Sequence, residues 1–492
     1  MEIGNTAKSV VVGRQAWLTL AILSSTLLTV FFSETMLLPA LPEIIRDFSI
    51  SYGTAAWIFS AYLIVAAVMT PVAGRLSDLY GKKKVLLTLL AIYIAGLTAG
   101  GFADNISVLL ATRIVQGVGL AAVPAAFSLL RDTFPPAKLP LAIGVFGSAY
   151  SAGSVVGLLA GASIIQNFGW HSTFLAIVPF SALVTLMIAK FVKENNASVA
   201  PSSTKASEPS EKARKAAAID IKGVLALSAT IASFLVALTL IQVGVSSANL
   251  PQIASAFVVS GVSLTVFVML ERKIVPPFLD LRLLKNKILL PAFLLLISTG
   301  ITMFMIYPTI VQLVRSPTPL GFGGSAVDAA NVQLPFMIAF LVFSAITPFI
   351  INRIGSVKPA VIGGIVSLIG SIGLLAFHLT ELETSINLAI VASGLSLTMT
   401  STWNVVVSFS PREFMGISTG VGALLLFIGM AIGPALAGVY LENRATVPGV
   451  PGLYPSPASY NVVFLTAGLL SAATLVFGSM LIRRASHKVI AV

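Results

Sequence analysis

Fourteen long apolar segments run through the 492-residue chain, and they constrain its fold more than any other feature. A helix needs about 20 apolar residues to cross the hydrocarbon core of a bilayer, where each backbone group must find its partner within the same segment. A transmembrane β-barrel would instead show short strands of alternating polarity. We therefore expect transmembrane helices at 17–40, 53–73, 85–102, 107–130, 141–165, 171–191, 221–244, 249–270, 288–313, 328–351, 359–379, 385–408, 416–440 and 459–482.

The scarcity of charge supports this interpretation. Charged residues make up 10% of the chain and hydrophobic residues 57%, whereas soluble domains are about 25% charged. So few charges cannot cover a water-facing surface, and the sequence predicts an all-α polytopic membrane protein surrounded by the lipid bilayer. The net charge of +12 does not indicate nucleic-acid binding, because the basic residues lie in alternate loops. With no cysteine and three scattered histidines, we expect no metal site.

Lysine and arginine are distributed unevenly between the two sides of the predicted bundle. Three of them, Arg46, Arg315 and Arg444, fall in the loops of one side, and Arg113 lies inside a helix. The other 26 of the 30 fall on the opposite side. Because basic loops stay in the cytoplasm, we expect a plasma-membrane protein with both termini cytoplasmic.

An internal repeat divides the predicted helices into two sets. Pro135, Gly144, Gly153 and Gly157 recur 276 residues later, as Pro411, Gly420, Gly429 and Gly433. The repeat predicts two six-helix halves in parallel, with a substrate site at their interface. Two further helices would be inserted between the halves. We place the boundaries as follows: a first half at 1–192, a cytoplasmic linker at 193–219, two inserted helices with a cytoplasmic connection at 220–287, and a second half at 288–492.

A short charged stretch, 74–84, separates the second and third apolar segments. A carboxylate that meets the N-terminus of a neighbouring helix in only one conformation would favour that conformation. The simpler alternative is that the lysines only fix the topology, and we expect this to hold for most of Lys82 to Lys84. On the first interpretation the stretch is a conformational gate made of Gly74, Arg75, Asp78, Gly81, Lys82 and Lys83.

This stretch and the helix count resemble the major facilitator superfamily over nearly the whole chain, and within it the fourteen-helix drug:proton antiporter branch. The run from Arg113 to Gly119, RIVQGVG, is similar to the family's motif in helix 4. The glycines at 153, 157 and 161 partly match the antiporter motif in helix 5, with Leu158 in place of its proline. In the gate motif, Leu79 stands where the family usually has a basic residue. In the first-helix motif, Ser33 stands where the family usually has an acid, and the acid of this chain, Glu34, is the next residue. The resemblance implies alternating access, a cytoplasmic latch and a role for Arg113 in proton transfer.

Glu34 is the only acid well inside a predicted helix, and it lies eight residues before Pro42. At 1.5 Å per residue it would be roughly 12 Å below the outer interface. A charge there costs about 2.5–3.5 kcal/mol and usually faces a cavity. We therefore expect Glu34, with Arg113 and Gln116 one helical turn apart, to form a proton-coupling or substrate site. The alternatives are a hydrated Glu34 near the membrane surface and an Arg113 that only anchors helix carbonyls.

Two further groups of residues complete the predicted sites. Small residues every four positions let helices approach closely, which we expect of Gly153, Gly157, Gly161, Gly429, Gly433 and Pro434. Polar and aromatic residues of the second half are candidates for lining a cavity, although each alone is also typical of a helix–helix contact. These candidates are Tyr307, Gln312, Gln333, Phe336, Trp403 and Asn404.

The sequence contains no catalytic motif and no dinucleotide- or phosphate-binding loop. We therefore expect no enzyme, no catalytic residues, no cofactor and no obligate protein partner. The prediction is a secondary active transporter that exports amphipathic or cationic small molecules in exchange for protons. Two alternatives stay open: an importer or uniporter of a metabolite with the same fold, and a lipid flippase.

Overall fold

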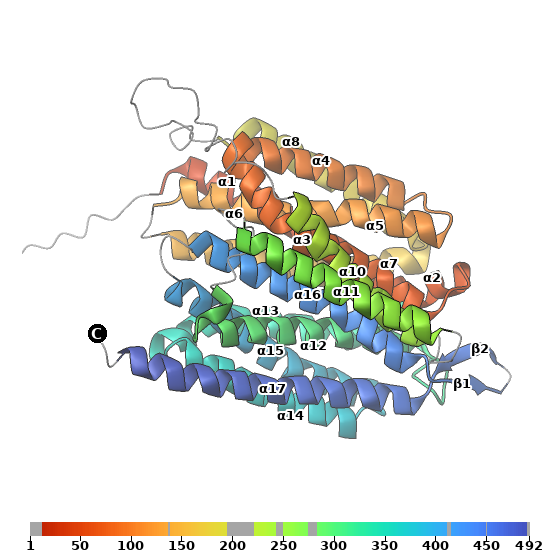
Figure 1. Cartoon of the computed structure of the whole chain (residues 1–492). Coiled ribbons are helices and arrows are strands. Elements are labelled where there is room, and N and C mark those ends of the chain that lie inside the picture. The colour runs from red at the N-terminus through yellow and green to blue at the C-terminus, as the bar shows by residue number, and fades with distance from the viewer. Residues whose placement is uncertain are drawn as a thin grey trace, which may run out of the picture.

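The computed structural model describes residues 12–135, 138–193, 221–242, 249–273, 283–410, 415–448 and 450–489. Long helices run side by side through this part of the chain (Figure 1). Fourteen helical segments in it are long and apolar enough to cross a membrane, which confirms the predicted number. The predicted linker at 193–219 lies outside the described residues apart from Lys193.

The elements follow one another in chain order as α1 (Arg14–Thr35), η1 (Leu38–Ala40), α2 (Leu41–Asp47), α3 (Tyr52–Tyr80), α4 (Lys82–Gly100), α5 (Ile106–Leu120), α6 (Ala122–Thr133), α7 (Leu139–Phe168), α8 (His171–Phe191), α10 (Ile221–Gln242), α11 (Leu250–Lys273), η3 (Leu283–Lys285), α12 (Leu289–Arg315), α13 (Ala326–Ile354), α14 (Val357–Ala376), α15 (Glu381–Phe409), α16 (Met415–Leu441), β1 (Arg444–Val447), β2 (Val450–Pro455) and α17 (Pro457–Val489).

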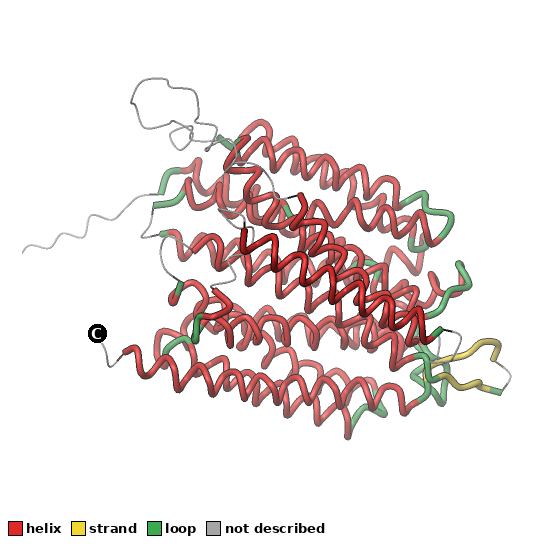
Figure 2. Tube along the Cα trace, in the orientation of Figure 1, coloured by secondary structure: helices red, strands yellow, loops and turns green. Residues whose placement is uncertain are grey.

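The bundle has two distinct ends (Figure 2). We call the end with η1, α2 and the strands β1 and β2 the hairpin end, and the end where α1 begins and α17 finishes the terminal end. Several helices that start at the hairpin end have polar N-caps. The side chains of Ser51 and Asn105 accept hydrogen bonds from backbone N–H groups three residues on, and Ser325 and Thr380 form capping boxes with Asp328 and Glu383. These caps satisfy amides that the first helical turn leaves free.

The charged stretch 74–84, which we placed between two helices, is itself almost entirely helical. Helix α3 continues through it to Tyr80, and α4 begins at Lys82. Gly81 alone forms the turn, with φ at +93°, a conformation that only glycine adopts readily. Gly355, between α13 and α14, has φ at +83° and forms the same turn in the second half, consistent with the internal repeat.

Two predicted helices are interrupted, although each is a single candidate membrane span. The first helix ends at Thr35 rather than at position 40, and the chain continues as η1 and α2, which have Pro39 and Pro42 in their first turns. The predicted helix 107–130 is divided at Ala121 into α5 and α6, where Pro124 has no N–H for the carbonyl four residues earlier. Between α16 and α17 the chain forms the antiparallel pair β1–β2.

The first six and last six long helices pack mainly among themselves, and the two halves meet along α3 with α16 and α7 with α13. The Ser60 hydroxyl donates to the Ala431 carbonyl across the α3–α16 contact, at 2.7 Å. Helix α10 lies against both α3 and α16, and the indole N–H of Trp57 in α3 donates to the Thr239 hydroxyl of α10 at 2.7 Å. Helix α10 therefore lies on one seam between the halves, and α11 packs against α10.

Candidate functional site

Glu34 occupies the last turn of α1, immediately before the chain breaks into η1. Its side chain is only 2% exposed, and its Oε2 atom is buried without a hydrogen-bond partner. In this structure Glu34 is therefore buried inside the protein and is not exposed near the membrane surface.

Three glycines of α7 bring that helix against the backbone around Glu34. A Cβ atom added to Gly153 would lie 2.5 Å from the Leu28 carbonyl oxygen, and one added to Gly157 would lie 2.5 Å from that of Phe32. At Gly161 it would lie 2.6 Å from the Met36 carbonyl oxygen. The site is therefore built where two helix backbones touch. In the second half, Gly429 and Gly433 on α16 approach α12 in the same way. A Cβ atom added to either would collide with a carbonyl oxygen of α12, that of Ile297 or Ile301, and Pro434 follows inside α16.

Arg113 is fully buried in α5 and does not form an ion pair with Glu34 in this conformer. Its Nε atom donates to the Ile58 carbonyl of α3 at 3.0 Å, and one terminal nitrogen donates to the Ser33 carbonyl of α1 at 3.4 Å and to Gln116 Oε1 at 2.8 Å. The guanidinium carbon lies 4.2 Å from the centroid of the Tyr62 ring. Its other terminal nitrogen is buried without a partner. Arg113 thus joins α1, α3 and α5, and its contact in α1 is the carbonyl of the residue just before Glu34.

Gln116 lies one turn after Arg113 and completes the polar network. Its amide nitrogen donates to the Gly96 carbonyl of α4 at 3.0 Å, and its oxygen accepts from Arg113 and, at 3.5 Å, from the Ser33 hydroxyl. The structure therefore brings together the three residues that we grouped from the sequence.

Aromatic side chains from both halves form a continuous row of ring contacts, and two tyrosines of this row, Tyr150 on α7 and Tyr307 on α12, are near enough to Glu34 to feel its charge. Between these two tyrosines, ring contacts pass through Phe340 and Phe336, with centroid distances of 6.2 Å, 6.3 Å and 5.0 Å in turn. Phe31 of α1 lies edge-on to Tyr150 at 4.2 Å. We call Phe31, Tyr150, Tyr307, Phe336 and Phe340 the aromatic wall.

The sequence pointed to only part of this wall. Tyr307 and Phe336 were candidates, whereas Phe31, Tyr150 and Phe340 were missed. Phe336 and Phe340 are four residues apart and share one face of α13, and this spacing was the available signal.

Of the other cavity candidates in the second half, the two glutamines lie near Tyr307 and the other two residues lie elsewhere. Gln333 is 2% exposed, its amide nitrogen donates to the Tyr307 carbonyl at 2.5 Å, and its oxygen is buried without a partner. Gln312 lies five residues after Tyr307 in α12, and its side-chain oxygen is also buried without a partner. Trp403 packs instead against α16, where a Cβ on Gly422 would lie 3.1 Å from its ring. No contact places Trp403 or Asn404 at the aromatic wall among the described residues.

The predicted gate residues lie at the terminal end. Lys82 forms an ion pair with Asp132 of α6, and the Lys83 ammonium donates to the Ala189 carbonyl of α8 at 2.8 Å. Both contacts stay within the first half. The side chains of Arg75 and Asp78 are outside the described part of the structure, and Gly74 has no atom within 4 Å of an added Cβ.

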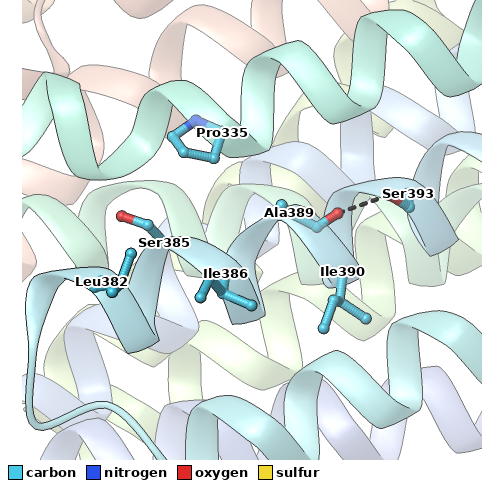
Figure 3. A pocket seen from close by; sticks show the side chains of 7 residues that line it. All are labelled: Pro335, Leu382, Ser385, Ile386, Ala389, Ile390 and Ser393. Carbon is cyan, nitrogen blue, oxygen red and sulfur yellow. Dashed lines mark hydrogen bonds between the residues drawn. The ribbon is translucent and has the colours of Figure 1, made fainter.

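A surface hollow between α13 and α15 is not part of this site. It has a volume of about 340 Å³ and is lined by apolar groups with Ser385 and Ser393 (Figure 3). Leu382 and Ile386 on its rim are 70% and 53% exposed, so the hollow lies on the outer surface of the helix bundle. In the described residues no three His, Asp or Glu side chains come together as a metal site.

Comparison with known proteins gives one consistent family. Residues 23–434 match the model of the Major Facilitator Superfamily. The multidrug resistance protein Stp of Mycobacterium tuberculosis (strain CDC 1551 / Oshkosh) is 27% identical over 92% of this chain and 81% of its own length. The tetracenomycin C resistance and export protein of Streptomyces glaucescens is 24% identical, over 90% of this chain and 79% of its own.

Solved structures agree on the fold. The human organic anion transporter MFSD10 superposes with a TM-score of 0.62 at 15% identity, over 94% of this chain and 99% of that one. An auto-inhibited peptide transporter of the POT family also gives 0.62, at 17% identity over 94% and 96%. The chain therefore belongs to the Major Facilitator Superfamily, and it is a membrane transporter rather than an enzyme.

Proposed function

We propose that this transporter exports amphipathic cations in exchange for protons by alternating access, with its hairpin end outside the cell. The observation that carries the proposal is the buried, unpartnered carboxylate oxygen of Glu34 beside an aromatic wall built from both halves. The orientation follows from the 26 basic residues on the predicted cytoplasmic side.

The chemistry of the site suits an organic cation. Aromatic faces attract cations through the ring quadrupole, by about 0.5–2 kcal/mol each depending on desolvation. A carboxylate adds a full opposite charge, and the apolar rings accommodate the rest of an amphipathic molecule. Because Tyr150 and Phe31 belong to one half and Tyr307, Phe336 and Phe340 to the other, relative movement of the halves would open and dismantle the wall.

A single carboxylate also supplies a mechanism for exchange. A buried charge without a partner is costly, so Glu34 is most stable when a proton or a cation neutralises it. The two cannot occupy the carboxylate together. Binding a proton from outside would release the cation there, and losing that proton inside would prepare the site for the next cation.

The names of relatives support the export of drug-like molecules. Proteins with 24–27% identity are described as multidrug resistance proteins and as a resistance and export protein for tetracenomycin C. These names describe those proteins, and for this chain they add weight to the geometry.

The test is transport of a fluorescent cationic dye in proteoliposomes under an imposed pH gradient. We expect the wild type to move dye against its gradient and Glu34→Gln to lose the pH-driven component. Glu381→Gln is the matched control, because it removes an exposed acid at the start of α15 and should transport normally. Absence of pH-dependent flux in the wild type would overturn proton exchange, and unchanged flux in Glu34→Gln would overturn the role of Glu34.

A further inference from the structure

One ion pair at the hairpin end joins the two halves of the transporter. Glu43 of α2 pairs with Arg315, the last residue of α12. The side chains are only 20% and 16% exposed, respectively. Three other ion pairs between described residues lie within one half: Arg46–Asp47, Lys82–Asp132 and Arg444–Glu442.

A second acid, this one from the second half, contacts the first half at the hairpin end. Glu442 follows α16 and accepts a hydrogen bond at 3.4 Å from the backbone N–H of Gly53, in the first turn of α3. Arg444 holds the same Glu442 oxygen at 2.9 Å. The first-turn amides of a helix are free to bind an anion. Each half thus extends one carboxylate to the other.

The sequence gives these arginines added significance. Only three of the 30 basic residues fall on the predicted outer side, and two of them, Arg315 and Arg444, take part in these contacts. Positive charge there does not serve topology. The backbone agrees with a closed end, since η1 and α2 contact α12, and η1 also contacts α13.

We propose that Glu43 and Arg315 form a latch that holds the hairpin end closed and must break when that end opens. Glu442 strengthens it from the other half. A contact made in one conformer only shifts the equilibrium towards that conformer by its own free energy. The latch rests on the proposed alternating access but requires neither a particular substrate nor proton coupling.

The pair is asymmetric in a way that can be tested. The second carboxylate oxygen of Glu43 is buried without a partner, so Arg315 is the main compensation for its charge. Removing Arg315 leaves an uncompensated buried carboxylate, which favours opening more than removal of Glu43 does. We therefore expect Arg315→Gln to open the hairpin end at least as much as Glu43→Gln.

The experiment is a distance measurement between spin labels in detergent, without substrate or gradient. The chain has no cysteine, so labels can be placed at Asp104→Cys, between α4 and α5, and Leu379→Cys, between α14 and α15. Both sites are exposed, in different halves and at the hairpin end. In the wild type we expect one dominant short distance. In Arg315→Gln a longer distance should appear, with the open-to-closed ratio rising roughly tenfold, which corresponds to 1.4 kcal/mol.

The exchange Glu43→Arg with Arg315→Glu should restore the short distance, because the pair is rebuilt in reverse. Arg46→Gln is the matched control: it removes a charge from the same end, where Arg46 pairs only with its neighbour Asp47, and it should leave the distance unchanged. A wild type that already favours the long distance, single variants that match the wild type, or an exchange that restores nothing would each overturn the latch. Since no transport is measured, these outcomes are independent of the dye experiment.

Discussion

Arg113 donates to the backbone carbonyl of Ser33 and not to the carboxylate of the next residue, Glu34. The positive charge is therefore fixed beside the acid by carbonyls and by Gln116, while the acid itself stays free to bind something else. A direct ion pair would have neutralised both groups and left no site. This arrangement makes Arg113 a positioning residue that joins α1, α3 and α5.

Replacing Arg113 by lysine should therefore strongly reduce transport, although the positive charge is kept. Lysine cannot reproduce the planar fork that reaches Ile58, Ser33 and Gln116, and each lost charged hydrogen bond is worth about 1.5–3 kcal/mol. We expect pH-driven dye efflux to fall at least tenfold, about 1.4 kcal/mol, in proteoliposomes. Arg131→Lys, at an exposed position in the last turn of α6, is the control and should keep its activity. Normal efflux by Arg113→Lys would show that charge alone is sufficient.

Replacing glycine by alanine at two positions of α7 should change stability in opposite directions. Gly157→Ala places a Cβ 2.5 Å from the Phe32 carbonyl oxygen, so we expect a loss of about 1–3 kcal/mol in the free energy of unfolding. Gly147→Ala meets nothing within 4 Å and should gain about 0.5–1 kcal/mol through helix propensity. Thermal unfolding in detergent measures both. Equal shifts of Tm would contradict the close approach of α7 to α1.

The aromatic wall predicts a change in apparent affinity. Phe340→Leu keeps an apolar side chain but removes a ring that links Tyr150 to Phe336. With a cation–π contribution of about 1 kcal/mol, KM for a cationic dye should rise roughly fivefold, and KM for a neutral dye, if one is transported, should rise less. Phe349→Leu on the same helix is 71% exposed and serves as the control. Equal changes for both dyes would indicate a packing effect rather than recognition of charge.

His378, between α14 and α15, predicts how stability depends on pH. Burial lowers the pKa of its imidazole below the ordinary value, and the nearby Glu383 opposes this only in part. The unfolded chain therefore takes up the proton at higher pH than the folded one, so this residue's contribution to stability declines as pH falls through about 6.5. Tm of His378→Phe should fall less than that of the wild type between neutral and mildly acidic pH. Parallel curves would contradict the prediction.

The sequence was informative where one strong physical constraint acted on it. Bilayer thickness determined the number of long helices, which the sequence predicted correctly. Boundaries were less accessible, because the apolar character of α1 continues through its break at Thr35 and the charges at 74–80 are compatible with a helix end. The hairpin β1–β2 carries too many prolines and glycines to be recognised as strands.

Residue type alone identified the charged members of the candidate site, but the sequence did not show which face of each helix points inward. Charged groups such as Glu34 and Arg113 are rare in a membrane and therefore conspicuous. Tyr150 and Phe340 lie on helices that are apolar on all sides, and such helices give no periodicity from which the inward face could be identified. That information becomes available only when α7 and α13 are seen side by side.

Helix α10 lies against α3 and α16, one from each half, and the Trp57–Thr239 hydrogen bond attaches it to α3. In the proposed alternating-access cycle the halves move relative to each other, so we expect α10 to stay with α3 and its contact with α16 to slide. The inserted helices α10 and α11 would then move with the first half and enlarge it on one side of the molecule.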